Sequence, residues 1–392
     1  MKLLRRFYAL SIIPIISILL ALLFGAILII LTSPASHGSF DLLLPIKAYE
    51  ALLEGATGIS FLDVDGDTTT LAISLIPSEQ ALTNSLVRAS PLILTGLAVG
   101  VGFKAGLFNI GGNGQVLVGA FFAALTGAAV AQQPVPLALT IAVLAGALGG
   151  ALYGFIPGAL KAFTGAHEVV VTIMLNSLAA LAIVGLVNDV FLIQGPTFNR
   201  TADVGNAAMP VLFGRDGHLG VFIALAMVPI VYFLIYRTTL GFEIRTVGAN
   251  PSAARYAGMS PRRLIILTLS LSGLLAGLAG TIVILGPSLG YYPAVFGTTI
   301  GFVGITVALL GRSHPVGILL AALLLGGMSA GGSTMQIQAD IQPEIIDVIQ
   351  GLILLFLAAE VVIRRFLRIR AETVAPEELQ TVSSSYGQGS TT

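Results

Sequence analysis

Long, mainly apolar runs alternate with polar stretches along the chain. About 20 consecutive apolar residues suffice to cross the hydrocarbon core of a bilayer as a helix. Ten such runs occur, at 7–31, 83–103, 115–131, 136–160, 168–187, 219–236, 264–285, 295–310, 315–331 and 343–363. The pattern therefore predicts an all-α integral membrane protein with about ten transmembrane helices and a transmembrane core at 83–363.

The first run is predicted to be a membrane anchor that covers residues 1–31. It has no charged residue over the 25 positions from Phe7 to Leu31 and follows Lys2, Arg5 and Arg6. The apolar segment of a secretory signal peptide is only about 7–15 residues long, so this run is too long to be one. The lone spans at 7–31 and 219–236 each precede four others, which suggests two pseudo-repeated groups, as in many transporters.

Composition agrees with a membrane protein. Of the 392 residues, 56% are hydrophobic and 10% are charged, whereas soluble domains average about 25% charged residues. The 46 glycines favour close approach between transmembrane helices. There is no cysteine, so disulfide and thiol chemistry are excluded.

Basic residues indicate an orientation for the spans. Threading the ten spans from a cytoplasmic N-terminus places 15 of the 19 lysines and arginines inside, and leaves Lys47, Arg88, Arg200 and Arg215 outside or near the outer face. The positive-inside rule favours this arrangement. We therefore expect both termini in the cytoplasm, an extracytoplasmic loop at 32–82 and a polar cytoplasmic tail at 364–392.

Three aspartates lie near the tip of the expected outer loop. Asp63, Asp65 and Asp67 have the spacing that begins a calcium-binding loop. That loop type needs a glutamate at its twelfth position, and residue 74 is serine. A solvated loop is therefore favoured over a metal site.

The polar stretch Arg237–Arg263 lies between the sixth and seventh predicted spans. It carries five arginines and one acidic residue, Glu243. Asn250 followed by Pro251 is typical of a helix start, and Gly258 of a helix end. A helix of two turns is too short to be stable alone, so it needs a surface to pack on. We interpret 237–263 as a cytoplasmic coupling segment.

The stretch 102–115, GFKAGLFNIGGNGQ, is rich in glycine, which disfavours a continuous helix. Irregular backbone at membrane depth is tolerated where it is buried in protein or lines a watery cavity. Asn109, Asn113 and Gln115 would then offer neutral hydrogen-bonding groups to a solute. The alternative is a turn that packs two helices, with the amides satisfying backbone groups.

The fifth span begins with a polar stripe. Thr172 and Asn176 are spaced i and i+4, and Glu168 extends the same helical face toward the cytoplasm. Such a stripe marks either a solute path or hydrogen bonds between helices. Both interpretations stay open on the sequence alone.

The sequence lacks the motifs of several function classes. There is no P-loop motif for ATP hydrolysis, and the four histidines are isolated from one another. No acidic residue lies clearly in mid-membrane, so the proton relay of many ion-coupled carriers is missing. If transport is active, its energy comes from another protein.

Three motifs together resemble a known family. They are LILTGLAVGVGFKAGLFNIGGNGQ, HEVVVTIMLN, and VGANPSAARYAGMSPRRL with the following LSGLLAGLAG. In this order they resemble the permease subunits of bacterial ABC importers of the branched-chain amino acid/simple sugar class, and among these the nucleoside-importing members. The resemblance extends from about Lys47 to Ile363, and Asn113 departs from it, since family members often have an acidic residue there.

The resemblance implies a coupling helix between spans six and seven that docks on an ATP-hydrolysing subunit. The residues that match its motif are Gly248, Ala249, Asn250, Ala253, Ala254, Arg255, Tyr256 and Gly258. It also implies a bacterial inner-membrane location and alternating access driven by ATP and Mg²⁺ bound to the partner ATPase, with no cofactor on this chain. The implied partners are that ATPase, a second homologous permease in a heterodimer, an extracytoplasmic solute-binding lipoprotein and membrane lipid, without nucleic acid.

A neutral, hydroxyl-rich solute suits a path lined by amides and hydroxyls. Nucleosides fit this description, and a simple sugar such as a pentose is the alternative. A self-sufficient secondary carrier or channel is the alternative of a different class, and the missing proton relay counts against it. An intramembrane enzyme has no nucleophile and base pair or metal triad to support it.

Overall fold

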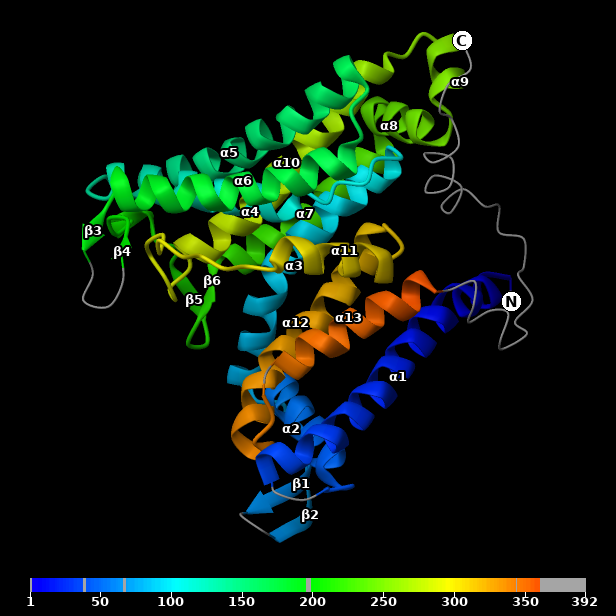
Figure 1. The fold of residues 1–392 in the computed structure, drawn as a ribbon, viewed down its shortest axis with the longest axis vertical. Coiled ribbons are helices and arrows are strands. Elements are labelled where there is room, and N and C mark those ends of the chain that lie inside the picture. The colour runs from blue at the N-terminus through cyan, green and yellow to red at the C-terminus, as the bar shows by residue number, and fades with distance from the viewer. Residues whose placement is uncertain (1, 38–39, 66–67, 195–198, 343, 360–392) are drawn as a thin grey trace. The chain divides into compact units, whose positions relative to one another are not determined.

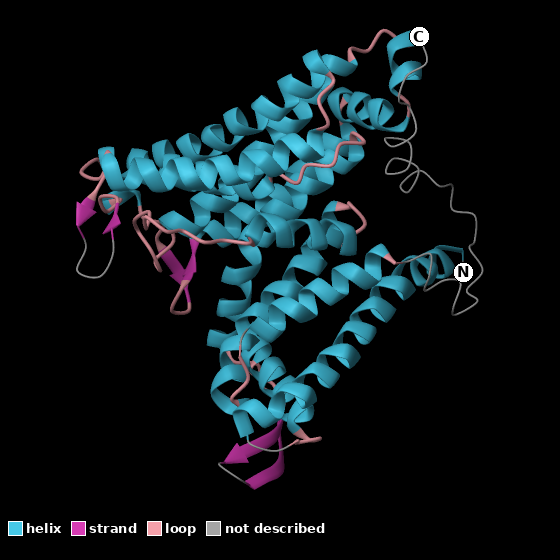
Figure 2. Cartoon of the chain, in the orientation of Figure 1, coloured by secondary structure: helices cyan, strands magenta, loops and turns pink. Residues whose placement is uncertain are grey.

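The structure, a computed structural model, describes residues 2–37, 40–65, 68–194, 199–342 and 344–359. Among these residues helices dominate, and the strands form small antiparallel pairs (Figures 1 and 2). The described chain divides into two compact units. Unit 1 comprises the residues up to Ala89 and those from Leu323 onward, and unit 2 comprises Ser90–Ala322. The predicted all-α architecture is confirmed.

Unit 1 joins helices from the two ends of the chain. Helix α1 packs against α13 and α2, and the Tyr49 hydroxyl of α2 donates a hydrogen bond to the Leu22 carbonyl of α1. Its elements are α1 (Lys2–His37), α2 (Leu44–Thr57), β1 (Ser60–Asp65), β2 (Thr68–Ser74), the first part of α3 (Glu79–Lys104), the last part of α12 (Pro315–Ala339) and α13 (Glu344–Ala358).

Unit 2 contains the remaining helices. They are the end of α3, α4 (Gly112–Ala129), α5 (Val135–Thr164), α6 (Glu168–Asp189), α7 (Leu219–Arg237), α8 (Thr239–Ala249), α9 (Pro251–Tyr256), α10 (Pro261–Leu285), α11 (Ile300–Leu310) and the start of α12. Between α6 and α7 the described chain forms β3 (Ile193–Gln194), β4 (Asn199–Arg200), the 3₁₀ turn Gly205–Ala207, β5 (Val211–Phe213) and β6 (Gly217–His218).

Helices α4, α5 and α10 form the centre of unit 2 and pack through small residues. A Cβ atom on Gly150 of α5 would lie 2.3 Å from the Gly273 carbonyl oxygen of α10. A Cβ atom on Gly119 of α4 would lie 2.3 Å from the Cα atom of Gly277. Close backbone approach of this kind explains the high glycine content, because no larger residue fits at these crossings.

Every predicted apolar run contains a helix, but not every helix has the length of a span. Seven described helices are long and apolar enough to cross a membrane, namely α1, α3, α5, α6, α7, α10 and α12. The predicted spans at 115–131, 295–310 and 343–363 correspond to α4, to the 11-residue α11 and to the described part of α13. The predicted total of about ten transmembrane helices therefore stays a prediction for these three elements.

The expected loop at 32–82 is largely regular structure. Helix α2 buries Leu44, Ala48 and Ala51 at helical spacing, and β1 and β2 pair as an antiparallel hairpin. Asp63 and Asp65 lie in β1, so they belong to a strand, while Asp67 lies outside the described residues. The predicted tail at 364–392 also lies outside the described residues.

Candidate transport site and coupling segment

The segment between α7 and α10 folds as two short helices. The Thr238 hydroxyl caps α8 by accepting a hydrogen bond from the Gly241 amide at 3.1 Å. The Asn250 side chain caps α9 and accepts from the amides of Ser252 and Ala253, both at 3.0 Å. Gly258 follows α9 with φ +82°. The helix start at Asn250 and the end before Gly258 are confirmed, whereas α8 was not predicted.

Helix α9 presents most of its surface to solvent. Ala254 is fully buried, while Ala253 and Arg255 are exposed and Tyr256 is 95% exposed. An aromatic side chain exposed to this extent on a helix of six residues suits a contact with another protein, since burying it adds apolar contact area.

The C-terminal end of α8 lies against the turn that follows α3. A Cβ atom on Gly248 would lie 2.3 Å from the Lys104 carbonyl oxygen. A Cβ atom on Gly106, whose φ is +68°, would lie 3.1 Å from the Gly248 carbonyl oxygen. The coupling segment is therefore in direct backbone contact with the glycine-rich stretch.

The glycine-rich stretch interrupts the helical structure, as expected. Helix α3 ends at Lys104 and α4 begins at Gly112. Asn109, buried in this break, donates to the Gln115 side-chain oxygen at 2.9 Å and to the Ser272 hydroxyl at 2.8 Å. Ser272 in turn donates to the Ala98 carbonyl at 2.7 Å. These bonds connect the break to α3, α4 and α10.

Asn176 of α6 holds the same break from the other side. Its side-chain oxygen accepts from the Gly114 amide at 2.7 Å, and its side-chain nitrogen donates to the Ile110 carbonyl at 3.0 Å. Thr172, one turn earlier, is buried against Gly111 and donates to the Val169 carbonyl. The polar stripe of α6 thus faces the break between α3 and α4.

Asn113 differs from its neighbours. Its side-chain oxygen is buried, and no group in the described part of the chain forms a hydrogen bond with it. The backbone of Asn113 lies against Gly301 of α11, because a Cβ atom on Gly301 would lie 2.3 Å from the Asn113 nitrogen. A buried acceptor without a donor is uncommon and points to a group that is satisfied by something bound.

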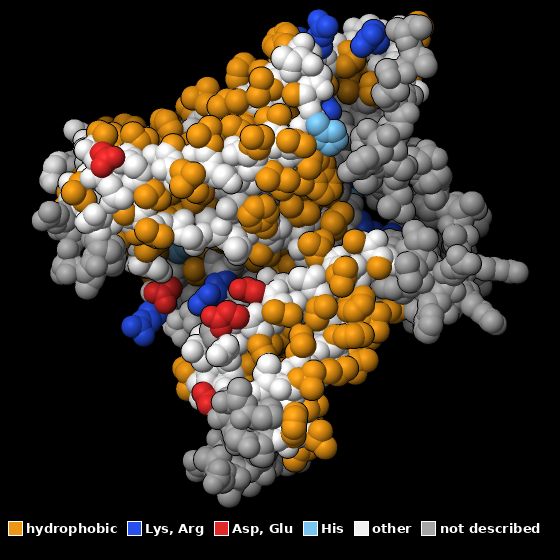
Figure 3. All heavy atoms as spheres, in the orientation of Figure 1, with side chains coloured by type: hydrophobic (Ala, Val, Ile, Leu, Met, Phe, Trp, Pro, Cys, Tyr) orange, Lys and Arg blue, Asp and Glu red, His pale blue; other side chains and the backbone are white. Residues whose placement is uncertain are grey.

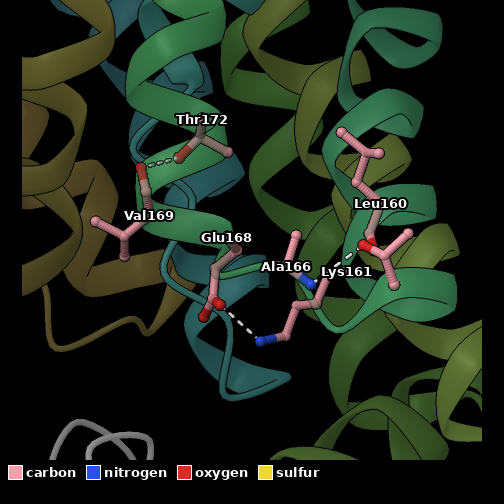
Figure 4. A network of polar contacts seen from close by, with 7 residues as sticks. Leu160, Lys161, Ala166, Glu168, Val169 and Thr172 are labelled. Atoms are coloured by element: carbon pink, nitrogen blue, oxygen red, sulfur yellow. Dashed lines mark hydrogen bonds and ion pairs between the residues drawn. The ribbon is translucent and has the colours of Figure 1, made fainter.

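An ion pair closes the turn between α5 and α6. The Lys161 ammonium lies 2.6 Å from the Glu168 carboxylate, and the two side chains are 26% and 6% exposed. Figure 4 shows Lys161 reaching from α5 toward Glu168, with Thr172 one turn further along α6. The pair fixes the start of the helix that carries Thr172 and Asn176.

Comparison with known proteins identifies the family. The sequence model of the family described as "Branched-chain amino acid transport system / permease component" matches residues 81–358. This chain belongs to that family.

The permease is also similar to curated proteins. It is 38% identical over 359 residues to the guanosine ABC transporter permease protein NupP of Bacillus subtilis, which covers 90% of this chain and 94% of NupP. It is 35% identical to the nucleoside ABC transporter permease protein NupB of Lactococcus lactis, over 76% of this chain and 84% of NupB. The glucose ABC transporter permease protein TsgB13 of Haloferax volcanii is 34% identical, over 81% and 86% of the two chains. No solved structure matches the permease.

The structure brings the five residues predicted for the solute path to one place. A hydrogen bond joins the side chains of Asn109 and Gln115, and Asn176 bonds to the backbone of Gly114 and Ile110. Thr172 packs against Gly111. These contacts agree with the interpretation of a turn that packs helices. Asn113 is the member of this set with a free acceptor. Whether any of them contacts a solute stays a prediction.

Sequence reasoning missed several residues of this region of the permease. Ser272 was not singled out, and it lies 163 positions after Asn109, so no local pattern links the two residues. Lys161 was noted for its charge, but its pairing with Glu168 was not predicted, although the two are only seven residues apart. Tyr153 of α5, whose hydroxyl donates to the Leu175 carbonyl of α6 at 2.6 Å, was also missed.

Proposed function

We propose that this chain is the membrane-spanning permease subunit of an ABC importer for nucleosides or a related neutral polar solute. The two relatives named for guanosine and nucleoside transport support the substrate class. The chain is a transport subunit, and a separate ATPase subunit binds ATP and Mg²⁺ and hydrolyses the nucleotide.

The observation that carries the substrate class is the unpartnered oxygen of Asn113. A carboxamide oxygen accepts hydrogen bonds and carries no net charge, so it suits a neutral donor such as a ribose hydroxyl or a base amino group. The neighbouring amides and hydroxyls are neutral as well. A site of this kind selects solutes that offer donors and penalises ions.

The coupling role is proposed for α9 and the end of α8. Its residues are Gly248, Ala249, Asn250, Ala253, Ala254, Arg255, Tyr256 and Gly258. The exposure of Tyr256 and Arg255 and the capped start of α9 support docking on the ATPase subunit. The backbone contact between Gly248 and the stretch that holds Asn113 supplies a route for the motion.

The remaining parts of the assembly follow from the same proposal. A second homologous permease completes a heterodimer, and an extracytoplasmic lipoprotein delivers the solute. The protein lies in a bacterial inner membrane with both termini in the cytoplasm. In this orientation the hairpin of β1 and β2 faces the outside.

Reconstituted transport tests the proposal. Proteoliposomes that contain this chain, the second permease and the ATPase, supplied with the loaded lipoprotein, are expected to take up radiolabelled guanosine when ATP is present. Omitting the ATPase is expected to abolish uptake. ATP-dependent uptake by this chain alone, or energised uptake that follows an ion gradient instead of ATP, would contradict the ABC mechanism and favour a secondary carrier.

A simple sugar is the second candidate substrate, because TsgB13 is named for glucose. Competition distinguishes the two. Unlabelled uridine or adenosine at a hundredfold excess is expected to suppress guanosine uptake, whereas glucose and ribose are not. Suppression by the sugar and not by the nucleosides would reverse the assignment.

Charge reversal in α9 tests the coupling role. Arg255→Glu is expected to lower uptake about tenfold or more while ATP hydrolysis by the assembled complex continues. The substitution replaces a positive charge that complements the ATPase surface with a negative charge that is repelled by it. Arg215→Glu in the exposed turn between β5 and β6 is the matched control and is expected to retain uptake. Unchanged uptake in Arg255→Glu would remove α9 from the coupling mechanism.

A further inference from the structure

A cluster of basic side chains lies where α3, α8 and the α11–α12 connection meet in unit 2. The cluster comprises Lys104, Arg245, Arg312 and His314, and each of these side chains is half-buried. We call it the basic cluster. It includes neither Asn113 nor the exposed residues of α9, and its Lys104 is the last residue of α3.

Two tyrosines of α7 tie the basic cluster together. The His314 ring lies 5.6 Å from the Tyr236 ring and 5.8 Å from the Tyr232 ring, measured between centroids. The Arg245 guanidinium carbon lies 5.3 Å from the centroid of the Tyr236 ring. Lys104 and Ser313 line the same small cleft, next to α7. The ring contacts bring α8 and the α11–α12 connection to the same tyrosines, and the cleft brings the end of α3 next to that connection.

The Arg312 side chain contains a hydrogen-bond donor that indicates a ligand. Its Nη2 nitrogen is buried and has no hydrogen-bond partner among the residues that the structure describes. Leaving a guanidinium donor buried and unpaired is costly, so such a group normally has an acceptor in the functional state. Arg312 and Ser313 both have φ +52°, a conformation that residues other than glycine rarely adopt.

The surroundings of Arg312 favour a negatively charged ligand. Helix α12 begins at Pro315, directly after the basic cluster, and the N-terminus of a helix carries partial positive charge. Figure 3 shows basic side chains at the end of unit 2 that carries α8 and α9, and hydrophobic side chains along the flanks of α5 and α6. The guanidinium groups of Arg245 and Arg312 are suited to an anion with several oxygen acceptors.

We propose that the basic cluster binds a phosphate-type anion, with the Arg312 Nη2 nitrogen donating to one of its oxygens. Two sources supply this chemistry, the headgroup of an anionic phospholipid and free phosphate. A bound anion joins the α11–α12 connection to Arg245 of α8. It therefore stabilises the base of the segment that carries α9, whatever solute the permease transports.

Calorimetric titration of the purified full chain in a neutral detergent tests the proposal. The ligands are sodium phosphate, dioctanoyl phosphatidylglycerol and, as the neutral-headgroup control, dioctanoyl phosphatidylcholine. Saturable binding of phosphatidylglycerol without phosphate binding identifies a lipid headgroup, and the reverse identifies free phosphate. If neither anion binds, or if phosphatidylcholine binds as tightly as phosphatidylglycerol and phosphate does not bind, the proposal is overturned.

Variants locate the site. Arg312→Gln is expected to weaken binding of the anion about tenfold or more, the usual effect of losing one hydrogen bond to a charged group. Arg215→Gln removes the same charge from an exposed turn of unit 2 and is expected to bind as the wild type does. Equal binding by wild type and Arg312→Gln would overturn the assignment.

A second pair of variants covers poor folding of Arg312→Gln. Arg312→Lys keeps the charge and loses the forked donor, and Arg245→Gln removes the neighbouring charge. Each is expected to bind more weakly than the wild type while eluting as a monodisperse peak in size-exclusion chromatography. Wild-type affinity in both folded variants would contradict the proposal.

Discussion

Gly106 and Gly248 lie backbone to backbone, although they are 142 positions apart in the sequence. The Gly248 carbonyl oxygen would be 3.1 Å from a Cβ atom placed on Gly106, and a Cβ atom on Gly248 would meet the Lys104 carbonyl oxygen at 2.3 Å. Neither contact involves a side chain that can rotate away. A shift of α8 is therefore transmitted directly to the turn that leads to Asn109.

Gly248→Ala is expected to damage this contact. Because the added methyl group meets backbone atoms that cannot yield, overpacking should lower the free energy of unfolding by about 1–3 kcal/mol and reduce ATP-driven uptake. Thermal unfolding and the reconstituted uptake assay measure the two effects.

Gly185→Ala is the matched control for Gly248→Ala. Gly185 lies within α6, and no described atom outside the adjacent residues and backbone of that helix lies within 4 Å of a Cβ placed there. Alanine favours a helix over glycine by about 1 kcal/mol, so this variant should be neutral or slightly more stable. An unfolding temperature of Gly248→Ala equal to that of the control would show that the backbone contact contributes nothing.

Asn176→Ala is expected to loosen the break between α3 and α4. The substitution removes the acceptor of the Gly114 amide and the donor to the Ile110 carbonyl, both of which stay buried. Each unsatisfied group costs about 1–3 kcal/mol, so the unfolding temperature should fall clearly. Ser177→Ala, at the next and exposed position of α6, should leave it unchanged. Equal effects of the two substitutions would contradict the role of Asn176.

Local sequence chemistry predicted those features that depend on neighbouring residues. Asn250 and Pro251 specify a helix start within three residues, and the structure shows the expected cap. The apolar runs predicted where helices lie, because burial in lipid or protein needs a continuous apolar stretch. Helix length was predicted less well, since Gly297 and its neighbours extend an apolar run that is not helical before Ile300.

The arrangement of the candidate site depends on contacts that no local pattern contains. The sequence showed three unusual polar residues in apolar surroundings, Asn109, Gln115 and Asn176. Their partners depend on how α4, α6 and α10 pack, and they include Ser272, Gly114 and Ile110. The free oxygen of Asn113 likewise follows from tertiary packing against Gly301. Sequence identified the polar residues, and only the structure separates the bonded ones from the unbonded one.

Removing Lys161 is expected to destabilise the start of α6. Lys161→Met leaves the Glu168 carboxylate 6% exposed and without its cation. Breaking a buried ion pair costs about 3–5 kcal/mol and a surface pair about 0–1, so a loss of about 1–3 kcal/mol is expected for this partly exposed lysine. Thermal unfolding of the purified protein measures it.

A double-mutant cycle isolates the ion pair from other effects of the two substitutions. Lys161→Met with Glu168→Gln is expected to be more stable than Lys161→Met alone, because the buried charge is then removed together with its partner. Strictly additive effects of the two single substitutions would mean that the 2.6 Å contact carries no coupling energy.

His218 is expected to make stability depend on pH. It lies at the start of α7, 3% exposed, and its Nδ1 atom accepts a hydrogen bond from the Gly220 amide at 3.2 Å. Burial lowers the pKa of His218 below the usual 6.5, and the charge of Asp216 opposes this in part. The unfolded chain therefore binds a proton more readily than the folded chain as pH falls below about 6.5. Stability is fully present above that pH and declines as pH falls toward the folded pKa.

His218→Asn tests this titration. Asparagine is a good helix cap and has no proton to gain, so the variant should keep α7 capped while its unfolding temperature changes less than that of the wild type between pH 7 and pH 5. Subtracting the two pH profiles removes the contribution of the other titrating groups. If the wild type does not lose stability relative to His218→Asn as pH falls from 7 to 5, His218 is not held neutral by burial in the folded protein.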